Sequence, residues 1–347
     1  MELILTLADI SQEELHSVGG KGANLGALIR AGFPVPVGFV LLTNAYQLFI
    51  HMNGFQEEIE RLAQQVTFDD LASCEQTSQA IRTLFELGTM PEDIAQSITQ
   101  AYQQLGADVV AIRSSATTED LPEASFAGLH ESYLNIHSLE DILMAVRQCW
   151  ASLWTPRALS YRTRLGIAAQ TVSMAVVIQQ MMQASISGVL FTVNPVSGAQ
   201  DEVVINATWG SREALVAGQI TPDTITVEKA SGRTKQRAFG TPSLMAVPSD
   251  GGMSDRGVGT AEPPLLILTN EQVAQLVRLG ERIEEHFGVP QDIEWAIADE
   301  QIFIVQARPI TTHVTTQPEP AYHGKPIPPG DDTWNREHDL PSQPYDV

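Results

Sequence analysis

Residues 291–310 read QDIEWAIADEQIFIVQARPI, in which apolar and polar residues alternate on both sides of a polar Asp-Glu pair. Because successive side chains of a strand point to opposite faces of a sheet, this alternation predicts a β-hairpin. Elsewhere the chain mixes strand and helix patterns without strict β-α-β alternation. The whole pattern therefore favours an α+β fold over a doubly wound parallel sheet.

The length of the turn decides which side chains face one another across this hairpin. A two-residue turn at the Asp-Glu pair leaves Glu294 opposite Val305. A three-residue turn places Glu294 opposite Gln306, and Asp292 opposite Arg308 on the same face. The three-residue turn also gives a coherent apolar face, formed by Ile293, Trp295, Ile297, Phe303 and Val305. We therefore predict the three-residue turn.

In this register one face of the hairpin carries the oxygens of Glu294 and Gln306 beside Arg308. Carboxylate and amide oxygens suit Mg²⁺, which takes few protein ligands and completes its shell with water and phosphate. A neighbouring guanidinium can contact the same phosphate. The alternative is an ordinary solvent-facing ion pair between Asp292 and Arg308, and the hairpin alone leaves both interpretations open.

A second stretch, HSVGGKGANLG at 16–26, surrounds Lys21 with glycines ahead of helix-forming sequence. We expect a glycine loop that leads into a helix ending near Gly32. Backbone N–H groups at a helix N-terminus bind phosphate, and Lys21 adds a positive charge. The spacing is neither that of a Walker A loop nor GxGxxG, and glycine also serves any tight turn. By itself this stretch supports a phosphate cradle and a plain loop equally.

A third stretch, AIRSSATTEDLPEASFAG at 111–128, places Arg113 at the end of an apolar strand, before small hydroxyl residues. A guanidinium and a flexible loop around Gly128 could reach a phosphate together. The simpler alternative is a surface arginine paired with Glu119 or Asp120, and these residues alone favour it.

Local signals predict three further segments. A Ser138–Asp141 capping box predicts a helix that continues to about residue 165. A second capping box, Thr269–Gln272, begins a helix with an apolar stripe. Residues 240–264 are rich in Gly, Ser and Pro, which predicts a loop.

Composition limits the partners and the compartment of this 347-residue chain, whose net charge is −22. Such an acidic balance disfavours nucleic acid and anionic membranes as partners. We find neither a basic leader nor an apolar run long enough to span a membrane. Two cysteines provide no disulfide framework, so we expect a cytoplasmic protein. The eight histidines do not cluster at metal-ligand spacing.

Five stretches, in this order, resemble the nucleotide-binding domain shared by phosphoenolpyruvate synthase, pyruvate phosphate dikinase and rifamycin phosphotransferase. They are VGGKGANLGAL, AIRSSATTEDLPEASFAGLHESYLNI, VVIQQMM, SGVLFTVNP and QDIEWAIADEQIFIVQARPIT. The resemblance spans residues 10–312 and favours the phosphate cradle. It implies an ATP-grasp fold, whose subdomains at 1–185 and 186–313 close over ATP. A linker toward absent domains is expected at 314–347.

The resemblance also implies roles for individual residues. Three basic side chains would hold the ATP phosphates and act in phosphoryl transfer: Lys21, Arg113 and Arg308. Three residues would lie along the nucleotide, the last of them at the adenine end: Gly128, Ser132 and Gln179. Two oxygen ligands would bind Mg²⁺: Glu294 and Gln306. Catalysis would then be electrostatic, with positive groups and metal offsetting charge on the transferring phosphoryl group.

The implied function is that of the ATP-binding module of a dikinase-type phosphotransferase. Such an enzyme cleaves ATP to AMP and phosphate and phosphorylates a histidine on a separate swivelling domain, for transfer to pyruvate or a rifamycin-type antibiotic. The expected partners are this phosphohistidine domain and an acceptor-binding domain, in the same full-length chain or on a separate subunit. The ending PPGDDTWNREHDLPSQPYDV resembles the linker that precedes these domains.

Two departures from the family keep other functions open. Residues 209–218 read WGSREALVAG where relatives have a sequence like GLGEALVSG, so Ser211 and Arg212 replace a small glycine-containing element. In addition, we find no histidine in the threonine- and glycine-rich setting of the phosphate carrier. The alternatives are a stand-alone subunit of a split phosphotransferase such as phenylphosphate synthase, or a non-catalytic nucleotide-sensing module.

Overall fold

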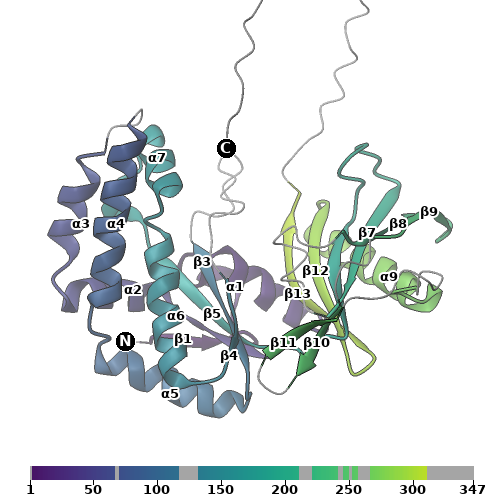
Figure 1. Ribbon diagram of the computed structural model, residues 1–347, viewed down its shortest axis with the longest axis horizontal. Helices are drawn as coiled ribbons and strands as arrows, with labels where there is room; N and C mark the ends of the chain where they lie inside the picture. Colours follow the sequence, from purple (N-terminus) through teal and green to yellow (C-terminus); the bar gives the residue numbers. More distant parts are fainter. Residues whose placement is uncertain are drawn as a thin grey trace, which may run out of the picture. The chain divides into compact units, whose positions relative to one another are not determined.

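The computed structural model describes residues 2–66, 70–116, 132–210, 221–240, 245–249, 252–256 and 266–310. Gly128, Ser211, Arg212 and the expected linker at 314–347 lie outside these ranges. Residues Met1–His313 belong to one compact unit. Its described part combines helices with antiparallel sheets (Figure 1), which agrees with the predicted mixture of elements.

The first sheet has five strands in the order β1-β2-β5-β3-β4, and all neighbours are antiparallel. The strands are β1 (Ile4–Thr6), β2 (Gly38–Leu41), β3 (Val110–Ala116), β4 (Ser132–Ile136) and β5 (Met174–Gln180). All residues of β3 are buried because hydrophobic cores form on both faces of this sheet. The predicted strand therefore does not end at Arg113 but continues through Ala116.

Six helices pack on one face of the first sheet and form the largest hydrophobic core. They are α2 (Thr43–Met52), α3 (Gln56–Ala63), α4 (Leu71–Leu87), α5 (Glu92–Leu105), α6 (Leu139–Ser152) and α7 (Pro156–Leu165), followed by the 3-10 turn η2 (Ala169–Thr171). Ser138 caps α6 by accepting a hydrogen bond from the Asp141 N–H, so the predicted helix start is confirmed. The predicted single helix to 165 is instead divided into α6 and α7.

The opposite face of the first sheet is covered by α1 (Leu15–Arg30), which follows the 3-10 turn η1 (Gln12–Glu14). Its Val18 and Leu25 belong to the same buried cluster as Val40 and Val177 of the sheet. The glycine-rich stretch is thus helical rather than a loop, and its helix is broken only at Gly19, where φ is 69° and ψ is 173°.

The second sheet has six antiparallel strands in the order β13-β12-β6-β7-β8-β9. The strands are β6 (Ile186–Phe191), β7 (Glu202–Trp209), β8 (Asp223–Glu228), β9 (Thr234–Ala238), β12 (Gln291–Ala298) and β13 (Gln301–Pro309). One face packs against α9 (Asn270–Phe287) in a separate core. Thr269 and Gln272 form the predicted capping box of α9.

The glycine-rich region at 240–264 is not only a loop. It contains an antiparallel pair, β10 (Met245–Ser249) and β11 (Gly252–Arg256), with Met245 opposite Arg256. Composition misled this prediction because backbone pairing between neighbouring segments does not require apolar side chains.

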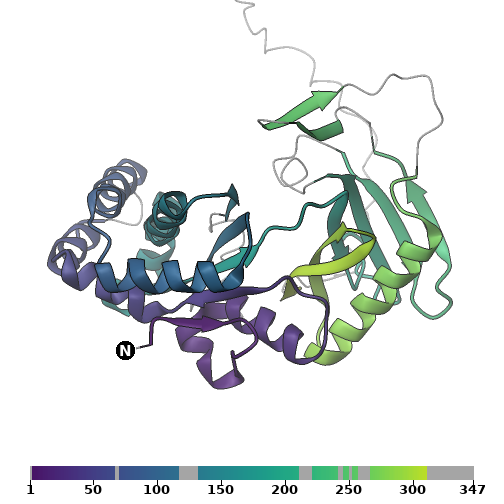
Figure 2. The ribbon, with the colours of Figure 1, turned by 90° about the horizontal axis from the view of Figure 1, so that it is seen from below.

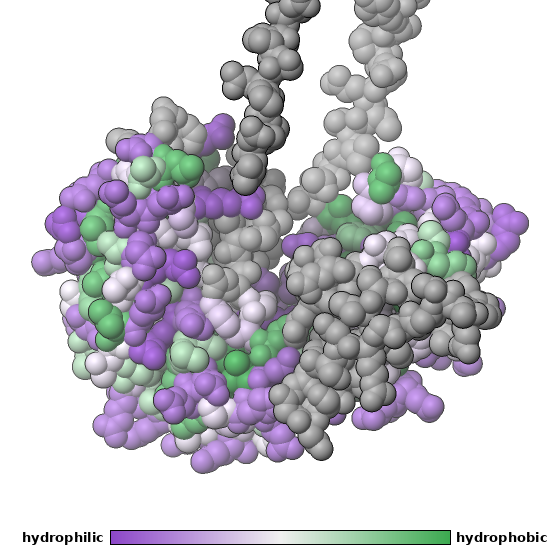
Figure 3. Space-filling model, in the orientation of Figure 1, coloured by the Kyte–Doolittle hydropathy of each residue, from purple (hydrophilic) through white to green (hydrophobic). Residues whose placement is uncertain are grey.

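The described surface is mainly hydrophilic. In the view of Figure 3, hydrophilic side chains cover much of the described surface, and hydrophobic ones form small separate patches. Among the described helices, none combines the length and the apolar character needed to cross a bilayer.

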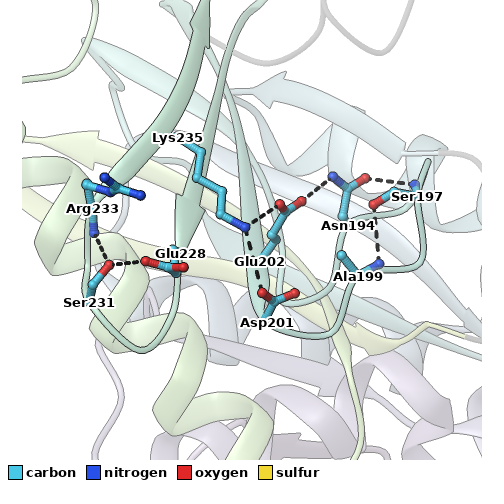
Figure 4. Close-up of polar contacts among 9 residues, drawn as sticks. All are labelled: Asn194, Ser197, Ala199, Asp201, Glu202, Glu228, Ser231, Arg233 and Lys235. Carbon is cyan, nitrogen blue, oxygen red and sulfur yellow. Dashed lines mark hydrogen bonds and ion pairs between the residues drawn. The ribbon is translucent and has the colours of Figure 1, made fainter.

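A charge network joins β7 and β9 at the edge of the second sheet (Figure 4). The Lys235 Nζ atom lies 2.9 Å from Glu202 Oε1 and 3.7 Å from Asp201 Oδ2. Asn194 Nδ2 donates a hydrogen bond of 2.7 Å to the other Glu202 oxygen. The hydrogen bonds from Lys235 and then Asn194 lower the pKa of the Glu202 carboxyl, and Glu202 in turn raises the pKa of Lys235.

Candidate functional site

The hairpin of β12 and β13 closes with a two-residue turn. Asp299 and Glu300 have φ values of 48° and 62°, the left-handed pair that a type I′ turn requires. Ala298 pairs directly with Gln301. The predicted three-residue turn is therefore wrong, because two acidic residues adopt the backbone conformation that such turns more often assign to Asn and Gly.

The shorter turn changes which residues of β13 face the core. Ile302 and Ile304 lie in the core of the second sheet, opposite Ile297 and Trp295. The predicted Phe303 and Val305 are half-buried and lie outside this core cluster. When a turn is shortened by one residue, the side chains of the following strand that faced the core face outward, and the others face inward. The wrong turn length therefore led to the wrong core residues on β13.

A β-bulge restores the predicted pairs farther along the hairpin. The register shifts between Glu294 and Trp295, so that Val305 is the extra residue on β13. Beyond the shift Glu294 faces Gln306, and Asp292 faces Arg308. The predicted juxtaposition is confirmed, although a bulge rather than a longer turn produces it.

Arg308 forms the ordinary cross-strand ion pair. Its Nη2 and Nε atoms lie 2.6 Å and 2.8 Å from Asp292 Oδ2. The Arg308 side chain is 46% exposed and the Asp292 side chain 13%. A role of Arg308 in holding phosphate remains a prediction.

Arg113 connects the first sheet to the hairpin. Its Nη1 atom lies 3.6 Å from Glu294 Oε2 and donates a 3.4 Å hydrogen bond to the Val305 carbonyl in the bulge. Arg113 is only 8% exposed, so the interpretation as a surface arginine is wrong. Glu119 and Asp120, the partners in that interpretation, lie outside the described residues. A positive charge from one sheet is thus held beside a carboxylate of the other.

Ser115, two residues beyond Arg113, holds the break in α1. Its Oγ donates to the Val18 carbonyl at 2.7 Å and accepts from the Gly22 N–H at 3.1 Å, so one buried hydroxyl joins both sides of the break. A Cβ atom on Gly19 would lie 2.3 Å from the Ser115 carbonyl oxygen. The break therefore requires glycine both for its positive φ and for this close approach.

The segment after the break also contacts the hairpin. Asn24 Nδ2 donates a 3.3 Å hydrogen bond to the Ala307 carbonyl, and α1 lies next to β13 in Figure 2. Lys21 precedes Asn24 by three positions, so the two residues share a side of the helix. The structure thus gathers the Lys21 segment, Arg113, Glu294 and Gln306 in one region.

The remaining predicted residues are less directly connected to this region. Ser132 is exposed and lies opposite Arg113 in the register of β3 and β4. Gln179 is only 1% exposed, and its Nε2 donates a 3.0 Å hydrogen bond to the Pro36 carbonyl. This amide therefore supports the start of β2, and contact with an adenine remains a prediction.

Sequence reasoning did not assign roles to Ser115 and Asn24. Ser115 lies beyond the predicted strand end at Arg113, yet the strand continues through it and is fully buried. A small polar residue in a buried strand usually has a backbone partner, and this rule could have identified it. Asn24 lies one helical turn after Lys21 in the glycine-rich stretch, which is a weaker signal.

The donor set fits Mg²⁺. Glu294 offers a carboxylate and Gln306 an amide oxygen from directly paired positions, and both side chains are largely buried. Among the described residues, no three His, Cys, Asp or Glu side chains gather as a metal cluster. Two oxygen ligands are nevertheless enough where water and phosphate complete the shell.

The region thus consists of two antiparallel sheets, which a largely buried arginine–carboxylate pair joins beside a helix that is broken at a glycine. The family model of the pyruvate phosphate dikinase AMP/ATP-binding domain matches residues 15–326. The chain belongs to this family of AMP/ATP-binding domains.

Two relatives of this chain are longer proteins. A probable phosphoenolpyruvate synthase of Archaeoglobus fulgidus is 43% identical over 314 residues, which cover 89% of this chain and 42% of the relative. A rifampicin phosphotransferase of Streptomyces sviceus is 42% identical over 317 residues, which cover 89% and 36%. The chain thus spans less than half the length of these relatives.

The likeness to solved structures is low. The D-alanyl-alanine synthetase A of Vibrio cholerae aligns with a TM-score of 0.27 and 11% identity, over 67% of this chain and 54% of that chain.

Proposed function

We propose that this chain is the ATP-binding module of a dikinase-type phosphotransferase that cleaves ATP to AMP and phosphate and phosphorylates a histidine on a separate swivelling domain. The observation that carries the proposal is the 3.6 Å approach of Arg113 to Glu294 beside the Lys21 segment. This approach brings the proposed phosphate-binding groups, Lys21 and Arg113, close to Glu294, the proposed Mg²⁺ ligand. The names of the two relatives support pyruvate or a rifamycin-type antibiotic as the final acceptor.

In this proposal Lys21, Arg113 and Arg308 bind the phosphates, while Glu294 and Gln306 hold Mg²⁺. The metal would neutralise charge on the phosphate oxygens as a Lewis acid. Arg113 and Glu294 are largely buried, and electrostatic interactions in such a region are stronger than in water. The protein would therefore act mainly by positioning and by charge.

An ATP-grasp arrangement is part of the same proposal. The strands of the first sheet lie between residues 4 and 180, and those of the second sheet lie between 186 and 309. These sheets would be the cores of the subdomains at 1–185 and 186–313, with β3 and the hairpin facing ATP. The phosphohistidine and acceptor-binding domains would be the partners, and we place the protein in the cytoplasm.

Calorimetric titration of the chain with ATP, with and without Mg²⁺, tests the proposal. We expect Lys21→Ala to weaken ATP binding about tenfold, the equivalent of about 1.4 kcal/mol. Glu294→Gln should remove the gain in affinity that Mg²⁺ provides, because it replaces the carboxylate ligand with a neutral amide of the same shape. Glu202→Gln is the matched control, since Glu202 is also paired with a cation but lies at β7–β9.

Two outcomes would contradict the proposal. The first is a folded wild-type chain that does not bind ATP. The second is an unchanged response to Mg²⁺ in Glu294→Gln, which would exclude Glu294 as a metal ligand.

A further inference from the structure

A cavity of about 390 Å³ lies in the helical part of the molecule, between α3, α7 and η2. Its polar lining is formed by Glu60, Gln64, Arg162, Thr163 and Gln170. Trp154 and Leu159 contribute apolar surface. No residue of the candidate phosphate and metal site belongs to this lining, so the cavity has to be explained separately.

Arg162 is the unusual residue of this cavity. It is 5% exposed, and its guanidinium lies over the Trp154 ring at 4.5 Å from the centroid. The buried Nη2 atom has no hydrogen-bond partner among the described residues. None of the described carboxylates forms an ion pair with Arg162 either. Burial lowers the pKa of Arg162 to about 10, so the side chain stays charged at neutral pH.

The guanidinium is held in place by the hydrophobic core. Trp154 Nε1 donates a 3.1 Å hydrogen bond to the Tyr46 hydroxyl, and both rings are almost completely buried. Tyr46 in turn stacks on Phe85 and contacts the edge of Trp150. A planar cation on a fixed aromatic platform is pre-organised to bind a planar or tetrahedral oxyanion.

The surroundings do not compensate this charge. Arg162 stacks on one indole and lies in the last turn of α7, and both interactions stabilise its positive charge. Their combined free energy is smaller than the desolvation penalty of a buried guanidinium. Glu60 is the acidic residue of the lining, and its carboxylate accepts a hydrogen bond from Gln56 on its own helix. An acceptor from outside the described chain would complete the site.

We propose that this cavity binds a small oxyanion, with a carboxylate or phosphate group that accepts hydrogen bonds from Arg162. The polar side chains of Gln64, Thr163 and Gln170 would contact the rest of the ligand, and Leu159 would pack against its carbon atoms. The site is independent of the proposed ATP site.

Thermal unfolding at constant ionic strength, with inorganic phosphate or succinate added, tests this site. Wild type should show a saturable rise in Tm with at least one of the two probes, because a ligand that binds only the folded state stabilises it. Arg162→Met should lose this rise while binding ATP normally. Lys21→Ala is the matched control and should keep the rise, because it alters only the proposed phosphate site.

A second variant separates loss of the site from damage to the core. Ala168 is exposed, with an extended backbone at the border of the cavity, so Ala168→Trp should obstruct the cavity without disturbing the core. This variant should unfold at the wild-type Tm without added anion and lose the rise. A response to phosphate alone would identify a phosphate ligand, and a response to succinate alone a carboxylate. The inference is overturned if neither probe raises the Tm, or if both variants keep the full rise.

Discussion

Two pairs of opposite charge show how differently this molecule uses ionic interactions. Glu202 and Lys235 lie 2.9 Å apart at the edge of the second sheet, and their side chains are 15% and 33% exposed. Glu294 and Arg113 lie 3.6 Å apart, and their side chains are 14% and 9% exposed. The first pair lies within one sheet, whereas the second joins two sheets.

The difference shows that a short distance is not a measure of importance. The carboxylates of the two pairs are similarly buried, so the difference lies in the cations, of which Lys235 is the more exposed. A pair with a solvated cation gains little from its contact, because water screens that charge in the folded chain as well. A largely buried pair interacts through a less polarisable medium, so loss of one partner is costly and a nearby ligand feels the charge strongly. The longer contact is therefore expected to be the stronger one, and it is the contact that we propose to act in ATP binding.

The largest effect is expected when each pair loses its cation. Arg113→Met should lower the free energy of unfolding by about 3 kcal/mol, because it leaves the Glu294 carboxylate in a buried position without this guanidinium. Lys235→Met should change stability little, because Glu202 keeps its hydrogen bond to Asn194. Urea denaturation measures both, and equal losses would refute the distinction between the two pairs.

An intermediate effect is expected at the helix break next to Arg113. Gly19→Ala should destabilise the protein by about 2 kcal/mol more than Gly32→Ala, because the new Cβ would collide with the Ser115 carbonyl. Both glycines have positive φ, 69° and 77°, but a Cβ on Gly32 would meet nothing within 4 Å. The loss of stability in Gly32→Ala therefore measures only the free-energy cost of a positive φ at a residue with a Cβ atom.

Urea denaturation and ATP titration of the two glycine variants provide the measurement. Gly19→Ala should also weaken ATP binding, because it displaces the segment that carries Lys21. Equal losses of stability in the two variants would show that the contact between Gly19 and Ser115 is not restrictive.

The smallest effect concerns the pH dependence of the exposed pair. The folded state lowers the pKa of Glu202, so the pair contributes stability above the ordinary glutamate pKa and loses it as the pH falls through the lowered value. Lys235→Met should therefore make the loss of stability on acidification slightly less steep. Urea midpoints from neutral to acidic pH test this, and a steeper loss in the variant would contradict the assigned sign.

The hairpin shows what periodicity can predict. Alternation predicted both strands and the pairing of Glu294 with Gln306. It did not predict the type I′ turn or the bulge, because both depend on the φ values of single residues rather than on the spacing of apolar side chains. Two compensating local features thus led to the correct pairing through a wrong turn.

The sequence by itself determined the family, the mixture of helices and strands, and the helix starts at Ser138 and Thr269, because motif order and capping signals are local. Only the tertiary structure decided that Arg113 meets Glu294, that Ser115 holds the break at Gly19, and that Arg162 lies buried on Trp154. These contacts join elements far apart in the chain, and their partners depend on how the two sheets and the helices pack. Local patterns do not record that packing, so these three contacts could be recognised only in the fold.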